Sequence, residues 1–279
     1  MRHCYALATP EFPDESTVFG LSCDYHDYEG FEDNVQRIAE AGYDGVDLVM
    51  LDPLDFDQDR VVNILGKYHL SVAAICTGEL YAQRGISLSH PNPYQRRTAV
   101  NRFNTLSGFA AQVGALLNIG RSRGEYVAGT AKEDTERFAV DAFTAISEYA
   151  GALGVQIALE PVNAGMMNFL NTAEEVQAVC TRVGLPNFGY MLDTQHLAWE
   201  HDPLQVIARF GKDCLHVHLT DTQRTCPGTG EIDFDAMVAA FAAAGYDGAF
   251  SHESVGMDED VDRAMDYMSP IFSRYYQGS

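Results

Sequence analysis

Short apolar runs alternate with amphipathic segments along the whole chain. The apolar runs lie near residue 4, within 41–48, at about 70–76, 115–120, 154–160, 187–193 and 213–219, and within 244–251. Helical spacing of apolar residues separates them, for example at 32–41, 95–113, 133–153, 172–183 and 233–244. Strands that alternate with helices indicate parallel βαβ units. Eight such units in 279 residues predict one domain, 1–279, folded as a closed (β/α)8 TIM barrel.

The joint between a helix and the next strand is visible as a repeated phrase. The sequence reads "AGYDGVDL" at 41–48 and "AGYDGAFS" at 244–251. Gly42 and Gly245 stand where a helix C-terminus favours a left-handed residue. Thr172, three residues before Glu175, forms a capping signal for the helix that follows. A doubly wound open sheet is the alternative fold, but no glycine-rich phosphate-binding sequence follows the first strand.

Four successive apolar runs end in a carboxylate or an imidazole. These residues are Glu160, Asp193 with His196 beyond it, His216 and His218 within one run, and His252 followed by Glu253. In a TIM barrel, chemistry gathers at the C-terminal ends of the strands. We therefore expect these side chains to meet at one mouth of the barrel.

Three carboxylates that converge on one mouth require a positive charge. Taken singly, an aspartate after a strand is usually a turn residue or helix cap, and a histidine is usually a packed core or surface residue. Together the carboxylates would repel one another, and a divalent cation would neutralise them. An oxygen-rich set with one imidazole suits Mn²⁺, Mg²⁺ or Co²⁺ better than a structural zinc. His216 and His218 point the same way on a strand, so only one of them needs to be the ligand.

Composition narrows the possible partners. The net charge is −22, from 18 Lys and Arg against 40 Asp and Glu, which argues against a nucleic-acid partner. The six cysteines include no CxxC pair and are expected to be reduced. The N-terminus reaches acidic residues before an apolar signal region forms, and no run approaches a membrane span. A cytoplasmic protein without a membrane partner is the expectation.

Several motifs together resemble a known family. "ALEPVN", "MLDTQH", "HVHLTDTQR", "PGTGEIDF" and "SHES", in this order, resemble the xylose isomerase-like TIM barrels, most closely the D-tagatose 3-epimerase and 5-keto-L-gluconate epimerase group. The resemblance implies one divalent ion, with Mn²⁺ preferred, and a homodimer or homotetramer. The implied metal ligands are Glu160, Asp193, His218 and Glu253. The two glutamates would also form the acid–base pair, and His196 and Arg224 would hold substrate oxygens.

The implied reaction is proton transfer next to the carbonyl of a ketose or keto-sugar acid. One glutamate would remove the proton to give a metal-stabilised enediolate, and the other would return one. The alternatives are a lyase on the same site (an inosose or dehydroshikimate-type dehydratase or a 3-oxo-C-glycoside deglycosidase), an abasic-site endonuclease, and a non-catalytic sugar sensor. The endonuclease is disfavoured because the third and fourth apolar runs end without histidine.

The chain departs from the family pattern in the segment after "LEPVN". Ala164 and Met166 stand where many such epimerases carry an arginine and a glutamate, and Met166 is expected either to line an apolar wall for a bulkier substrate or to pack within the loop. Arg121 and Arg123 follow the fourth apolar run and lie near the same mouth. They would either bind a carboxylate or phosphate of the substrate or pair with surface carboxylates.

Overall fold

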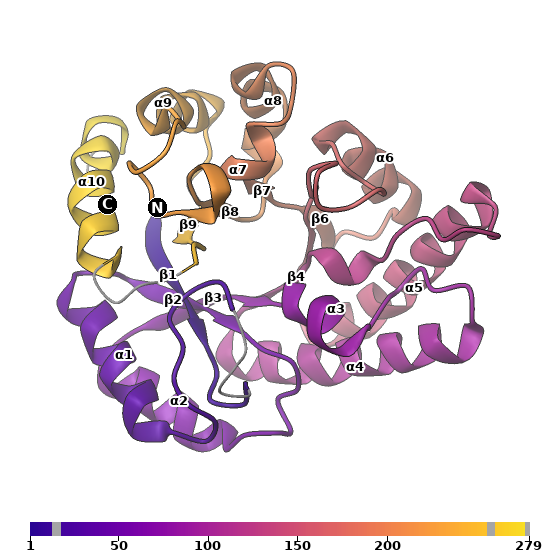
Figure 1. Ribbon diagram of the computed structural model, residues 1–279, viewed down its shortest axis with the longest axis horizontal. Helices are drawn as coiled ribbons and strands as arrows, with labels where there is room; N and C mark the ends of the chain where they lie inside the picture. The colour runs from indigo at the N-terminus through magenta and orange to yellow at the C-terminus, as the bar shows by residue number, and fades with distance from the viewer. Residues whose placement is uncertain (13–17, 256–259, 277–279) are drawn as a thin grey trace.

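The computed structural model of the protein describes residues 1–12, 18–255 and 260–276. All strands pair in parallel, and the helices surround them (Figure 1). The strands are β1 Arg2–Ala8, β2 Gly45–Val49, β3 Ser71–Cys76, β4 Leu116–Ile119, β5 Ile157–Leu159, β6 Phe188–Tyr190, β7 Leu192–Asp193, β8 Val217–Leu219 and β9 Ala249–His252.

The nine strands occupy eight positions around a barrel. Their order is β6-β5-β4-β3-β2-β1-β9-β8-β7, and β6 and β7 are separated in the chain only by Met191. The backbone N–H of Met191 donates to Leu159 of β5, whereas that of Leu192 donates to His216 on the other side. This one extended stretch therefore joins the two ends of the sheet and closes the barrel. The fold predicted from the alternating pattern is confirmed.

Helices cover the outer face of the strands. They are α1 Tyr28–Glu40, α2 Gln58–Lys67, α3 Gly78–Arg84, α4 Pro93–Val113, α5 Lys132–Ala152, α6 Ala173–Val183, α7 Thr194–Leu197, α8 Pro203–Phe210, α9 Phe234–Ala244 and α10 Asp260–Tyr275, with 3-10 turns η1 Arg121–Arg123, η2 Gly211–Asp213 and η3 Thr222–Arg224. The five helices indicated by apolar spacing correspond to α1, α4, α5, α6 and α9. Within the described residues, no helix combines the length and apolar character needed to cross a bilayer.

Local signals in the sequence explain where several elements end. Gly42 and Gly245 adopt φ values of 93° and 85°, which side chains with a Cβ rarely accept. Each lies just after a helix and before the next strand, as the repeated phrase predicts. Thr172 and Glu175 form the reciprocal capping box at the start of α6. The core is one large cluster of buried apolar side chains that spans the barrel and its helices.

The carboxylates and the imidazole at the C-terminal mouth of the barrel lie on the strands or on the first residue after them. Asp193 on β7 is the register partner of His218 on β8. The backbone N–H of Glu160 donates to Ile119 of β4, and that of Glu253 donates to Leu219 of β8. The strand ladder thus continues one residue beyond β5 and β9. This fixes both glutamates at the C-terminal mouth, because their backbone is still held by a neighbouring strand.

Candidate metal and active site

Four side chains converge at the C-terminal mouth of the barrel. Ligand atoms of Glu160, Asp193, His218 and Glu253 all lie within 4.8 Å of one another. His218 Nδ1 is 3.2 Å from Glu253 Oε2, 3.6 Å from Glu160 Oε1 and 3.9 Å from Asp193 Oδ2. All four residues are buried. The structure therefore brings together the whole set of ligands expected from the sequence.

The electrostatics of this cluster favour an added positive charge. Burial raises the pKa of Asp193 to about 6, although Arg224 opposes the shift. Burial would also raise the pKa of Glu253, but His218 and Arg224 hold it at about 2. For His218, burial would lower the pKa, yet Glu253 and Asp47 keep it well above the usual value. The site thus stabilises a cation at or beside the His218 imidazole.

A second carboxylate fixes the orientation of His218 from behind. Asp47, fully buried in β2, lies 2.6 Å from His216 Nε2 and 3.2 Å from His218 Nε2. The neighbouring imidazoles lower the pKa of Asp47 against the effect of burial, so it stays ionised. The ionised carboxylate can accept a hydrogen bond from Nε2–H of His218. If a metal ion displaces the proton that the raised pKa keeps on Nδ1, that nitrogen becomes an electron-pair donor on the side of the three carboxylates. His218 Nδ1 and Glu160 Oε1 have no hydrogen-bond partner among the described residues, so both fit a metal ion.

Two smaller clusters that share His218 fit a metal less well. One comprises Asp47, His216 and His218, and the other Cys76, His218 and Glu253. In the first, Asp47 already engages both imidazoles through Nε2. In the second, burial raises the pKa of Cys76 to about 12, so the sulfur stays a neutral thiol rather than the thiolate that binds metals. The four-residue cluster, with the oxygen-rich composition expected from the sequence, is therefore the best candidate for a metal site.

Replacing Asp47 is expected to weaken metal binding without touching a ligand. In Asp47→Asn the uncharged amide no longer fixes the His218 tautomer, and affinity for Mn²⁺ should fall about 10- to 100-fold. The measurement is competition with a fluorescent chelator on the metal-free protein, together with its thermal unfolding. Asp44→Asn is the matched control, because Asp44 accepts from the backbone N–H of His3 instead. Unchanged affinity in a folded Asp47→Asn protein would contradict the assignment.

Arg224 and His196 complete the polar wall of the site. Arg224 Nη1 lies 2.8 Å from both Asp193 Oδ2 and Glu253 Oε2, and Nη2 lies 2.8 Å from His196 Nε2. Burial, reinforced by Arg224, lowers the pKa of His196 well below its usual value, so the neutral ring accepts from the guanidinium. Gln223 and Arg224 both adopt positive φ, near 60°. Such strain costs on the order of 1–3 kcal/mol per residue and is concentrated at functional sites.

A small cavity opens beside these residues. It encloses about 380 Å³, including space open to solvent. Its walls contain Phe19, Val49, Cys76, Gly78, Glu79, Arg121, Glu160, Val162, Met166, His196, Arg224 and Glu253. Met166 thus lies on the cavity wall, one of the two positions that the sequence left open for it. Phe19 and Glu79 were not singled out from the sequence. Glu79 could have been found, because it is a carboxylate three residues after the end of β3.

Arg123 has a different position from the one expected. It is fully buried and donates to the carbonyls of Gly120, Glu160, Phe169 and Leu170, at 2.9–3.1 Å. Burial lowers its pKa to about 10. The expectation that Arg123 binds substrate is therefore corrected: it ties the ends of β4 and β5 to the following loop and supports Glu160 from below. Arg121 and Arg123 are only two residues apart, so the sequence suggested the same environment for both. In the structure, the turn η1 directs the two side chains to different surroundings.

We expect Arg123→Met to destabilise the fold strongly. Four carbonyl groups would lose the Arg123 guanidinium as a donor, although those of Gly120 and Leu170 also accept from backbone N–H groups. The free energy of unfolding should therefore fall by about 3–5 kcal/mol. Urea unfolding monitored by circular dichroism measures this change. Arg209→Met is the control, because the exposed Arg209 pairs with Glu174 at 3.0 Å and should change stability by less than about 1 kcal/mol. Wild-type stability in Arg123→Met would argue for a role other than support.

His252 lies on the opposite side of its strand from Glu253. Its Nε2 is 2.6 Å from Nε2 of His3, and the ring stacks on Tyr5 at 5.8 Å. Successive residues of a strand face opposite sides, so this imidazole points away from the carboxylates. Of the histidines at the strand ends, His218 and His196 face the site, while His216 stands behind His218.

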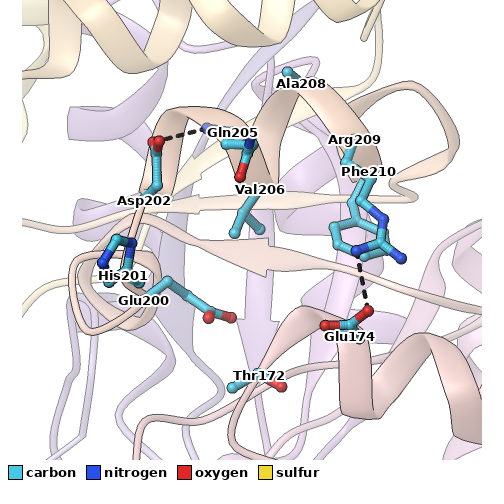
Figure 2. Close-up of a pocket in the computed structure, with 10 residues that line it drawn as sticks. All are labelled: Thr172, Glu174, Glu200, His201, Asp202, Gln205, Val206, Ala208, Arg209 and Phe210. Carbon is cyan, nitrogen blue, oxygen red and sulfur yellow. Dashed lines mark hydrogen bonds and ion pairs between the residues drawn. The ribbon is translucent and has the colours of Figure 1, made fainter.

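A larger hollow lies on the outside of the barrel, between α6 and α8 (Figure 2). It encloses about 1170 Å³, including space open to solvent, and several of its charged groups are paired locally. Arg209 pairs with Glu174, and Asp202 accepts from the backbone N–H of Gln205, as Figure 2 shows. Nothing in this hollow matches the converging carboxylates of the mouth, so we place the chemistry at the smaller cavity.

The fold and the site together define a (β/α)8 barrel with a carboxylate–histidine centre at its C-terminal mouth. Residues 35–271 match the family described as Xylose isomerase-like TIM barrel, and the chain belongs to that family. It is 28% identical over 239 residues to "Ketose 3-epimerase" of Arthrobacter globiformis, which covers 82% of this chain and 79% of that protein.

Solved structures agree with this fold. D-allulose 3-epimerase from Methylomonas sp., in complex with D-allulose, superposes with a TM-score of 0.80 at 21% identity, covering 97% of this chain and 96% of that one. The IOLI protein, solved with a bound zinc atom, has a TM-score of 0.76 at 19% identity and covers 99% and 100% of the two chains.

Proposed function

We propose that the protein is a divalent-metal-dependent sugar epimerase that acts on a ketose. The observation that supports this most directly is the convergence of two glutamates with Asp193 and His218, beside the Arg224–His196 pair. The similarity to ketose and L-ribulose 3-epimerases supports the same reaction class. Glu160, Asp193, His218 and Glu253 would hold one ion, with Mn²⁺ preferred over Mg²⁺ or Co²⁺ because the set is rich in hard oxygen donors.

The two glutamates are suited to move a proton between opposite faces of a substrate. Glu160 follows β5 and Glu253 follows β9, and the β6/β7 stretch and β8 lie between them around the barrel. Their carboxylates therefore approach the centre of the mouth from different sides. One removes the proton next to the carbonyl, and the other returns a proton to the opposite face of the same carbon. Bound at this site, the ion would act as a Lewis acid that stabilises negative charge on the substrate oxygens.

Arg224 and His196 would orient those oxygens. The Arg224 guanidinium already bridges Asp193 and Glu253, so its N–H groups stand at the edge of the carboxylate cluster. A fixed cationic donor placed there lowers the barrier because it needs no reorganisation as charge develops. The neutral His196 holds the other arm of the guanidinium in place through its Nε2.

Proton NMR in D₂O distinguishes this reaction from its rivals. The Mn²⁺-loaded protein, incubated with a panel of ketoses, should exchange one C–H next to the carbonyl and produce the epimer. An aldose product would indicate an isomerase instead, and loss of water or of an aglycone would indicate a lyase. If no member of a panel of ketoses, keto-sugar acids, sugar phosphates and 3-oxo-glycosides exchanges a proton, the proposal fails.

A further inference from the structure

A largely buried ion pair lines the cavity and shares no residue with the candidate metal-ligand cluster. Glu79, at the start of α3, and Arg121, in η1, approach to 2.6 Å between Oε1 and Nη2. Their side chains are only 5% and 20% exposed, whereas pairs such as Arg209–Glu174 are largely solvated. Burial raises the pKa of Glu79, and the Arg121 charge opposes that shift. Both residues line the same cavity as Glu160 and Glu253.

The cavity lining combines two groups of charged side chains with apolar ones. The first group comprises Glu160, Glu253 and Arg224, and the second is the Glu79–Arg121 pair. Val49, Val162 and Met166 add apolar surface to the same lining. A molecule that binds the carboxylate cluster in this cavity would therefore also meet the Glu79–Arg121 pair.

The aromatic ring of Phe19 lies near both arginines of the cavity. The ring lies 4.9 Å from the guanidinium carbon of Arg224 and 5.7 Å from that of Arg121. The next residue, Gly20, donates its N–H to Ser254 at 2.7 Å, and its positive φ and contact with the Ala6 carbonyl leave no room for a Cβ. Phe19 is thus held at the cavity wall by a segment anchored on β1 and on the residues after β9.

The Glu79–Arg121 pair combines a hydrogen-bond acceptor and a hydrogen-bond donor, and a sugar hydroxyl can bind to both. Burying a carboxylate and a guanidinium together stabilises a fold little, because desolvation offsets their attraction. Of the guanidinium nitrogens of Arg121, Nη2 is the one that donates to a side chain within the described residues. Glu79 Oε2 accepts from Gln83 at 3.1 Å and keeps further acceptor capacity. A hydroxyl beside the pair would donate to Glu79 and accept from Arg121.

We propose that the Glu79–Arg121 pair is a second recognition element, which binds substrate hydroxyls outside the carboxylate cluster and discriminates against anionic sugars. This inference rests on the proposed epimerase function. Three carboxylates and two arginines line the cavity, and Asp193 of the ligand cluster adds a fourth carboxylate, so one divalent ion would balance their charge without any anion from the substrate. A carboxylate or phosphate on the substrate would meet Arg121 with its charge already matched and would face Glu79.

The test compares Glu79→Gln and Arg121→Met with the wild type, all loaded with Mn²⁺. The substrates are D-fructose and D-tagatose, their 6-phosphates, and a keto-hexonate. For a neutral ketose, Glu79→Gln should raise KM about tenfold, the equivalent of one well-placed hydrogen bond, with kcat within about threefold. The ratio of kcat/KM for the anionic over the neutral sugar should rise at least about tenfold, because Arg121 loses its partner. Arg121→Met should raise KM for all substrates.

Glu174→Gln is the matched control, because it removes the carboxylate of the exposed Arg209 pair outside the mouth and should change none of these values. Unchanged KM and unchanged anion preference in a folded, metal-binding Glu79→Gln protein would overturn the inference and leave the epimerase proposal standing. A fall in kcat alone would also overturn it. If the wild type turns over no sugar, the epimerase proposal fails, and calorimetric titration with the same sugars still tests the pair: Glu79→Gln must bind neutral ketoses more weakly and anions more tightly.

Discussion

Glu253→Gln is expected to lower turnover of a ketose by about a thousandfold or more at saturating metal. The amide keeps the shape of the side chain but accepts no proton, and a positioned acid or base contributes about 10²- to 10⁴-fold to such reactions. The loss of one anionic ligand should also weaken metal binding, so the assay requires the affinity of each variant to be measured first. Glu160→Gln is expected to cause a loss of similar size.

Isotope exchange gives this prediction a sharper form. If the glutamates serve opposite faces, each single variant should still exchange the substrate proton of one epimer with D₂O while it forms little of the other epimer. The two variants should show opposite preferences when started from the two epimers. The Glu174→Gln control should behave as the wild type. Near-normal epimerisation by Glu253→Gln would show that the acid–base assignment is wrong.

Removal of divalent ions is expected to abolish activity, and Mn²⁺ should restore it. Three buried carboxylates within 4.8 Å of one another repel, and Arg224 contacts only two of them. An ion that binds the folded protein should also stabilise it, by about 2.7 kcal/mol at a free concentration 100 times its Kd. For a protein of this size, that corresponds to a rise in Tm of several degrees.

The two readouts of the metal experiment check each other. Activity and Tm are measured after dialysis against a strong chelator and during titration with Mn²⁺, Co²⁺, Mg²⁺ and Zn²⁺. Both should rise over the same range of free metal concentration. Full activity after chelation, with no change in Tm on adding metal, would remove the ion from the mechanism and with it the reason for assigning Asp193 and His218 as ligands.

At Ala164 and Met166 the chain differs from the epimerases that it resembles, and the structure shows where this loop lies relative to the cavity. The sequence showed that two charged positions of the resembling epimerases are missing from this loop, and the structure places Met166 on the cavity wall. Glu79 and Arg121, from α3 and η1, form a charged pair on the same cavity. We propose this pair, and not the loop at 164–166, for polar recognition of the substrate.

The sequence by itself determined the barrel and the composition of the carboxylate cluster. Periodicity and helix-ending glycines are local properties, and in a parallel barrel every strand end points to the same mouth, so Glu160, Asp193, Glu253 and one of His216 and His218 could be placed together. The choice of His218 came from the resemblance to the family. The residues that surround this cluster could not be predicted from periodicity and strand ends. Asp47 was visible only as a charge within an apolar run, and its hydrogen bonds depend on which strands become neighbours.

Only the tertiary structure separated Arg121 from Arg123. The two stand two residues apart in the same turn, yet one reaches the cavity and pairs with Glu79, whereas the other is sealed beneath Glu160 by four carbonyls. Hydrogen-bond partners of a long side chain come from segments distant in sequence, and the barrel brings those segments together only when it closes. Spacing along the chain therefore fixes which strand end a residue belongs to, while packing decides whether its side chain faces the ligand or the protein.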